Sequence, residues 1–113
     1  MRWLALVLTL LAAPADAACR QALALGLDVS SSVDDTEYRL QLDGLAAALL
    51  KPEVRAAFLA LPDAPVRLYV FEWAGSGPKR EVLNWQEIGS AADLAGVAAR
   101  LRGTGRGAMP PST

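Results

Sequence analysis

The chain has 113 residues, which is enough for one small domain and not for two. Its 11 basic and 12 acidic residues give a formal net charge of −1, a balance that offers no electrostatic reason to bind nucleic acid or an anionic membrane. The absence of histidine and the presence of a single cysteine, Cys19, exclude thiolate–imidazole catalysis, zinc sites of the ordinary type and an internal disulfide.

The amino-terminal segment has the pattern of a secretory signal peptide. A positive charge at Arg2 precedes an apolar run of about ten residues and an Ala-x-Ala end at Ala17. The run is too short to cross a membrane, which takes about 20 apolar residues. We therefore expect residues 1–17 to be removed, leaving a mature domain over residues 18–113 in a periplasmic or secreted protein without a membrane span.

The first two elements of the mature domain are a predicted strand and a predicted helix. Residues 21–29 predict a buried strand, because aliphatic residues run up to a polar stop at Asp28 and Gly26 disfavours a helix. Asp34 and Glu37 form a capping box, which marks a helix start. Apolar residues then recur at helical spacing at Tyr38, Leu42, Leu45 and Leu49.

The next elements are a short helix, a strand, a hairpin strand and a last helix. Pro52 opens a helix to about Leu61, whose apolar side is Val54, Phe58 and Leu61. Residues 66–73 are β-branched and aromatic on both faces, so we expect helices to cover both faces of this strand. Residues 80–85 predict its hairpin partner. Ser90 caps a final helix that bears Leu94, Val97, Ala98 and Leu101, and a glycine-rich loop follows.

The stretch from Asp28 to Ser32 carries the strongest chemical signal in the chain. Asp28, Ser30 and Ser32 follow the predicted strand at a spacing of i, i+2 and i+4. A loop that curls after the strand would turn their oxygens towards one point. Such donors suit Mg²⁺ or Mn²⁺, which take oxygen ligands and keep several waters. The alternative is a serine-rich turn that caps the next helix, a common structure.

The pattern Asp-x-Ser-x-Ser after an apolar strand resembles the metal-ion-dependent adhesion site of von Willebrand factor type A domains. The resemblance covers about residues 20–113 and is closest to a secreted bacterial subfamily of unknown function, through residues 24–33, 37–42 and 70–73. It implies an α/β fold, a partial doubly wound (Rossmann-like) sheet made of the first three strands with flanking helices. It also implies a metal at the carboxyl ends of the strands.

The resemblance implies which residues hold the metal. Asp28, Ser30 and Ser32 match the first ligand loop of the family, and Thr113 is the candidate for the threonine of the second, with Ser112 a poorer one. The aspartate of the third loop has no counterpart. The expectation is therefore a truncated von Willebrand factor A-like domain, or one that a partner completes, with a weakly bound Mg²⁺ or Mn²⁺ and an apolar edge on the first strand.

Three functions follow as hypotheses. The leading one is a non-enzymatic, Mg²⁺-dependent binding module of the adhesion type, in which an acidic side chain of a protein partner completes the metal shell. The second is an inert fragment without a function of its own. The third is a phosphohydrolase with Asp28 as nucleophile, similar to haloacid dehalogenases, but those enzymes resemble Asp-x-Asp and here Ser30 replaces the second acid. We expect no enzyme activity.

Other polar and aromatic residues receive structural interpretations. Glu72 is expected to reach solvent at the end of its strand, and the alternative is a functional carboxylate near the metal. Trp73 and Trp85 are expected to pack in the core or the hairpin rather than to form a binding surface. Three arginines are expected to complement the carboxyl end of the last helix rather than to form an anion site: Arg100, Arg102 and Arg106.

Overall fold

The structure, a computed structural model, describes residues 19–75, 77 and 79–107. The predicted signal peptide over residues 1–17 and the predicted ligand Thr113 lie outside this part of the chain. The elements are, in chain order, β1 (Gln21–Asp28), α2 (Asp35–Leu49), α3 (Pro52–Phe58), β2 (Val66–Trp73), β3 (Arg80–Ile88) and α4 (Ala91–Gly103). No helix among the described residues is long and apolar enough to cross a membrane.

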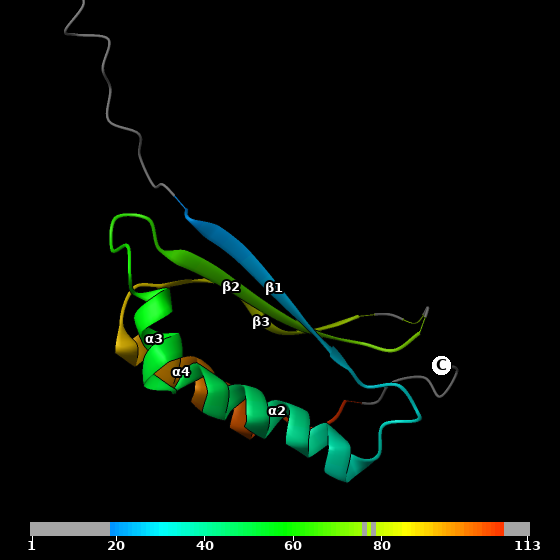
Figure 1. Ribbon diagram of the computed structural model, residues 1–113. Coiled ribbons are helices and arrows are strands. Elements are labelled where there is room, and N and C mark those ends of the chain that lie inside the picture. Colours follow the sequence, from blue (N-terminus) through cyan, green and yellow to red (C-terminus); the bar gives the residue numbers. More distant parts are fainter. Residues whose placement is uncertain (1–18, 76, 78, 108–113) are drawn as a thin grey trace, which may run out of the picture.

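The three strands form one mixed sheet in the order β1-β2-β3, so the described part of the chain belongs to the α/β class (Figure 1). β1 and β2 run parallel, with Leu27 opposite Glu72 and Asp28 opposite Trp73. A parallel pair needs a crossover connection, which α2 and α3 supply. β2 and β3 are antiparallel and form the predicted hairpin. The bounds predicted for β2 are confirmed at both ends.

Side-chain caps begin both long helices where the sequence predicts them. The Asp34 carboxylate accepts a hydrogen bond from the N–H of Glu37 at 2.7 Å, and the Ser90 hydroxyl accepts one from the N–H of Asp93 at 3.1 Å. The buried residues of α4 are the predicted ones, Leu94, Val97, Ala98 and Leu101. Those of α2 are Tyr38, Leu42, Ala46 and Leu49. The predicted Leu45 is half-buried instead.

The short helix ends earlier than predicted. α3 stops at Phe58 instead of about Leu61, and Leu61 is 51% exposed instead of buried. The N–H of Ala64 donates to the carbonyl of Leu61 at 3.0 Å, so a turn that leads into β2 begins at Leu61. Leu61 therefore belongs to the turn that leads into β2 and not to the helix.

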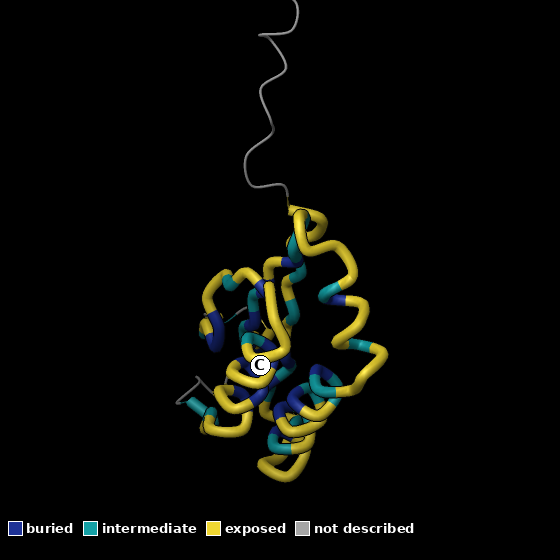
Figure 2. Tube along the Cα trace, turned by 90° about the vertical axis from the view of Figure 1, so that its left-hand side faces the viewer, coloured by how far each residue is buried: buried dark blue, intermediate teal, exposed yellow. Residues whose placement is uncertain are grey.

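The helices lie on one face of the sheet (Figure 1). Figure 2 shows buried positions gathered inside the molecule, while the outer turns of the helices are exposed. Alternation along β2 points four side chains to the covered face, where all are buried: Val66, Leu68, Val70 and Glu72. The prediction that helices cover both faces of this strand is therefore wrong for the described residues.

A row of aromatic side chains occupies the other face of the sheet. Tyr69 stacks on Trp85 with ring centroids 5.1 Å apart, and its centroid lies 5.8 Å from that of Phe71. The predicted hairpin packing of Trp85 is confirmed, although Trp85 is still 44% exposed and Trp73 is 38% exposed. The cross-strand pair of Tyr69 and Trp85, together with Phe71 on the same strand as Tyr69, thus covers part of this face, on which no described helix lies.

Gly26 lets these rings close over β1. A Cβ atom at this position would lie 2.8 Å from Cζ of Phe71 and 3.2 Å from Cδ1 of Trp73. Since real side chains do not approach so closely, any larger residue would push the rings away from the strand. Glycine thus leaves room for the rings of Phe71 and Trp73 to lie close to β1.

Replacing Gly26 by alanine should destabilise the fold by about 1–3 kcal/mol, because overpacking displaces the aromatic rings. Gly96 of α4 is the control, since a Cβ there meets nothing within 4 Å. Gly96→Ala should stabilise the protein by up to about 1 kcal/mol through helix propensity. Urea unfolding measures both effects. Equal changes in the two variants would contradict a packing role for Gly26.

Candidate metal centre

The loop after β1 brings three of the predicted site residues together. Asp28 ends β1, and its Oδ1 accepts a hydrogen bond from the backbone N–H of Ser30 at 2.9 Å. The hydroxyl oxygens of Ser30 and Ser32 lie 3.1 Å apart. The N–H of Val33 donates to the carbonyl of Ser30 at 2.9 Å and closes the turn. Asp28, Ser30 and Ser32 therefore gather at the carboxyl end of β1, and their role as metal ligands stays a prediction.

Hydrogen bonds from neighbouring elements fix the start of this loop. The N–H of Val29 donates to the carbonyl of Trp73 at 2.9 Å, which continues the β1–β2 pairing past the end of the strand. On α2, Nε2 of Gln41 donates to the carbonyl of Asp28 at 2.6 Å. The loop is thus tied to both the sheet and the helix.

Hydrogen bonding keeps the Asp28 carboxylate ionised. The backbone N–H of Ser30, followed by its hydroxyl, holds the pKa of Asp28 below its ordinary value of 3.8, against an opposing effect of burial. A donor that binds the charged form favours that form. The Asp28 side chain is therefore negatively charged at neutral pH.

The donor set of the loop consists of one carboxylate and neutral hydroxyls. Among the described residues there is no cluster of three or more histidine, cysteine, aspartate or glutamate side chains that could hold a metal ion. The acids that follow the loop are engaged elsewhere: Asp34 caps α2, and Asp35 pairs with Arg106 at 3.1 Å. Oxygen donors with a single charge fit a hard cation such as Mg²⁺ that keeps most of its waters, and fit soft or borderline metals poorly.

A buried carboxylate stands on β2 beside the end of β1. Glu72 is fully buried, so the prediction that it reaches solvent is wrong. The Tyr38 hydroxyl donates to its Oε2, and Nε of Arg80 lies 2.8 Å from its Oε1 in an ion pair. Glu72 shares its strand face with Leu68 and Val70, which places it on the side that the helices cover. Because side chains alternate between the two faces along β2, Glu72 points to the covered face and is buried. Its contacts with Tyr38 and Arg80 compensate for the water that the carboxylate loses on burial.

The partner of Glu72 on α2 stays protonated. Burial, then the hydrogen bond to Glu72 and its negative charge, raise the pKa of Tyr38 to about 12, while the charges of Arg80 and Arg39 act in the opposite direction. The hydroxyl is therefore a hydrogen-bond donor at every physiological pH.

Arg106 reaches the candidate loop from the far end of the described chain. Its Nη2 donates to the carbonyls of Val29 at 3.1 Å and of Ser30 at 3.2 Å. Its Nη1 pairs with Asp35, and its guanidinium lies 5.4 Å from the centroid of the Tyr38 ring. The interpretation of Arg106 as a helix-end charge is therefore wrong, because α4 ends at Gly103 and the side chain points to another element.

The other two arginines of the predicted cluster do lie in the last turn of α4, where cations favour the helix dipole. Nε of Arg100 also donates to the carbonyl of Val82 on β3 at 2.7 Å. Arg102 has no such contact among those described. The prediction that Arg100 and Arg102 lie at the carboxyl end of the last helix is thus confirmed.

Two further arginines fix residues 104–107, which we call the arginine-held loop. Nη1 of Arg39 donates to the carbonyl of Thr104 at 2.7 Å, and Nη2 of Arg80 donates to the carbonyl of Gly105 at 2.6 Å. Nothing in the local sequence signals these contacts, since they join residues 65 and 25 positions apart. The carboxyl ends of β1 and β2 and the arginine-held loop therefore form one connected polar region.

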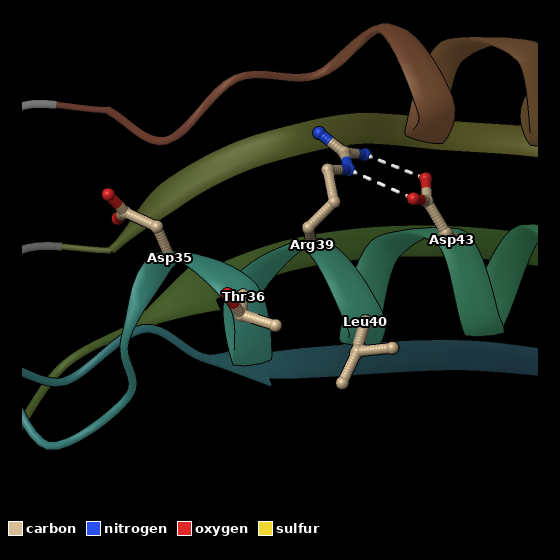
Figure 3. A pocket seen from close by; sticks show the side chains of 5 residues that line it. All are labelled: Asp35, Thr36, Arg39, Leu40 and Asp43. Atoms are coloured by element: carbon tan, nitrogen blue, oxygen red, sulfur yellow. Dashed lines mark hydrogen bonds and ion pairs between the residues drawn. The ribbon is translucent and has the colours of Figure 1, made fainter.

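A shallow hollow on the solvent side of α2 does not form a second site. It is lined by Asp35, Thr36, Arg39, Leu40 and Asp43, all from this helix (Figure 3). Arg39 and Asp43 already bind each other through two contacts of 3.0 and 3.2 Å. Asp35 is paired with Arg106. The charged groups around the hollow are thus paired with protein partners.

The chain belongs to a family described as "Protein of unknown function (DUF1194)", whose model matches residues 18–113. No curated protein matches the chain, and no solved structure does. The match begins directly after the predicted signal peptide and includes every residue of the candidate centre.

Replacing Glu72 by glutamine should destabilise the protein by about 1–3 kcal/mol, because it leaves the Arg80 guanidinium without its buried counter-charge. The expected value lies at the lower end, since Arg80 is partly exposed and water screens it. Glu87→Gln on the exposed side of β3 is the matched control and should change stability by less than about 0.5 kcal/mol. Urea unfolding tests both. An equally small effect at Glu72 would show that the pair is dispensable.

The raised pKa of Tyr38 predicts a loss of stability at alkaline pH. A phenol whose pKa is 10.0 when unfolded and about 12 when folded stabilises the native state fully below pH 10, and this contribution is lost as pH rises from 10 through about 12. Unfolding free energies measured below and above this window should fall less in Tyr38→Phe than in the unaltered protein. The same slope in both proteins would contradict the assignment.

Proposed function

We propose that this protein is a non-enzymatic, Mg²⁺-dependent protein-binding module of the von Willebrand factor A type. Asp28 would hold the cation through its carboxylate, Ser30 and Ser32 through their hydroxyls, and Thr113 would contribute from a second loop. The observation that carries the proposal is the clustering of Asp28, Ser30 and Ser32 at the carboxyl end of β1. Open α/β sheets bind their ligands at this end of the strands.

The order of elements supports the proposal. A parallel β1–β2 pair with a crossover helix, followed by an antiparallel β3 and α4, is what a partial doubly wound sheet of this type would contain. In such a sheet the first strand is central. Among the described strands β1 pairs only with β2, so its other edge is where a further strand would add.

The donor set defines the class of partner. A divalent cation held by one carboxylate and neutral hydroxyls keeps a net positive charge. An aspartate or glutamate side chain of a partner would replace a bound water and complete the shell. Few of the six positions of a Mg²⁺ shell are filled by this loop, and Mg²⁺ gives up its waters reluctantly, so we expect weak metal binding without the partner.

The positions of the neighbouring acids favour binding over hydrolysis. An aspartate-nucleophile phosphohydrolase needs a second acid close by to protonate the leaving group. Ser30 stands two residues after Asp28, while Asp34 caps α2 and Asp35 is paired with Arg106. The described acids near Asp28 are therefore committed to structural contacts.

We also propose that the protein acts in the periplasm or outside the cell. The signal-peptide pattern of residues 1–17 supports this location, and the family match that begins at residue 18 is consistent with a separate leader.

Mg²⁺ should bind the mature chain with a dissociation constant on the order of millimolar, and the Asp28→Ala variant should lose this binding. Asp63→Ala is the matched control, because Asp63 is an exposed carboxylate in the turn before β2, at the other end of that strand. Calorimetric titration with MgCl₂, with and without a chelator, measures the binding. Identical heats for the unaltered protein and Asp28→Ala would refute the site. Micromolar binding lost in Asp28→Ala would show that the loop is a complete metal site.

A further inference from the structure

We propose that Arg106 is a positioning residue of the metal-binding loop: it holds the backbone of Val29 and Ser30 so that the side chains of Asp28, Ser30 and Ser32 keep a common orientation. This inference rests on the proposed function. It assigns to the site a residue that lies more than 70 positions from the loop in sequence.

The geometry of the guanidinium carries the proposal. Nη2 spans two successive carbonyls, those of Val29 and Ser30, at 3.1 and 3.2 Å. Nη1 holds Asp35 in the first turn of α2 at 3.1 Å, and the ring of Tyr38 lies below the group. One planar fork of donors thus joins the end of β1, the loop and α2. A lysine ammonium, as a point charge, cannot repeat this arrangement.

Arg106 is itself held in place from the protein interior. A Cβ atom at Gly107 would clash with Nη1 of Arg80 and would lie 3.0 Å from both Cδ and Cζ of the same side chain, so the backbone next to Arg106 packs against Arg80. Arg80 donates to the carbonyl of Gly105 and pairs with the buried Glu72. A continuous set of contacts therefore runs from Glu72 through Arg80 and the arginine-held loop to Arg106 and the candidate site.

Arg106 acts on a bound cation in two opposite ways. Its positive charge would repel the cation, and its hydrogen bonds order the ligands. The charge is paired with Asp35, and water around the exposed loop screens what remains. Ordering therefore outweighs repulsion. Arg106→Gln removes both the charge and the fork, whereas Arg106→Lys removes only the fork, so the two variants separate the effects.

Amide hydrogen exchange tests the positioning without any metal. In the unaltered protein the N–H groups of Ser30 and Val33 are bonded within the loop. We expect both to exchange faster in Arg106→Gln and Arg106→Lys, on the order of tenfold, while the amides of the β2–β3 ladder keep their rates. Unchanged exchange at Ser30 and Val33 would overturn the proposal.

A titration with MgCl₂, followed through the NMR signals of the Ser30 and Ser32 amides, tests the effect on the metal. We expect both variants to bind several-fold more weakly than the unaltered protein, because each loses the fork. Tighter binding in Arg106→Gln together with unchanged binding in Arg106→Lys would show that only charge matters, and would overturn the proposal.

A matched pair of glycine variants tests the same contact without altering Arg106. Gly107→Ala would displace the loop from the Arg80 side chain, whereas a Cβ at Gly105 meets nothing within 4 Å. Gly107→Ala should therefore speed exchange at Ser30 and Val33, and Gly105→Ala should not. Equal exchange in the two variants would contradict the inference even if the Arg106 variants failed to fold.

The two proposals fail in different ways. If Mg²⁺ shifts no signal of the unaltered protein but the exchange results are as expected, the metal function is wrong and the positioning of the loop by Arg106 stands. If binding depends on Asp28 but the Arg106 variants bind and exchange like the unaltered protein, the function stands and the positioning role is wrong.

Discussion

The buried carboxylate of Glu72 is the constraint on which this end of the molecule depends. A carboxylate removed from water is tolerated only with partners, and here they come from two other elements, Tyr38 of α2 and Arg80 of β3. The packing of α2 on the sheet must therefore bring Tyr38 to Glu72, and the pairing of β3 with β2 must bring Arg80 to the same carboxylate. Because Arg80 also binds the carbonyl of Gly105, the loop after α4 is fixed by the same group.

Arginine side chains connect elements to one another by donating to backbone carbonyls. In the part of the chain that the structure describes, five arginines do so: Arg20, Arg39, Arg80, Arg100 and Arg106. Carbonyls at helix ends and in loops have no partner within their own element, and an arginine that reaches them satisfies this need. Arg39, for example, binds Leu101 and Thr104 at the end of α4. Much of the positive charge in this chain therefore serves its internal structure, in line with a composition that gives no reason to bind polyanions.

The parts of the structure that could be predicted are those with local signals. The β-branched and aromatic composition of residues 66–73 predicts both ends of β2, and capping residues predict the starts of α2 and α4. The clustering of Asp28 with Ser30 also follows from neighbours in sequence. The burial of Glu72 and the reach of Arg106 do not, because Glu72 meets Tyr38 34 positions away and Arg106 meets Val29 77 positions away. Such contacts depend on how the elements pack, which no local pattern encodes. The face of the sheet that no described helix covers is a related case, because the prediction that β2 is buried on both faces rests on the composition of that strand alone.

The state of the loop hydroxyls bears on how a cation would bind. The oxygens of Ser30 and Ser32 face each other at 3.1 Å, and Asp28 is held by the backbone of Ser30. A cation that takes these oxygens as ligands would replace a hydrogen bond between two neutral groups, which is worth only about 1 kcal/mol in water. The hydroxyls are thus close together before any metal arrives, and bringing them to it needs little rearrangement. What the loop lacks is charge, because Asp28 is its single ionised donor. A ligand that brings its own carboxylate would therefore add more to the stability of the bound metal than either serine does, and so cation and partner should bind cooperatively.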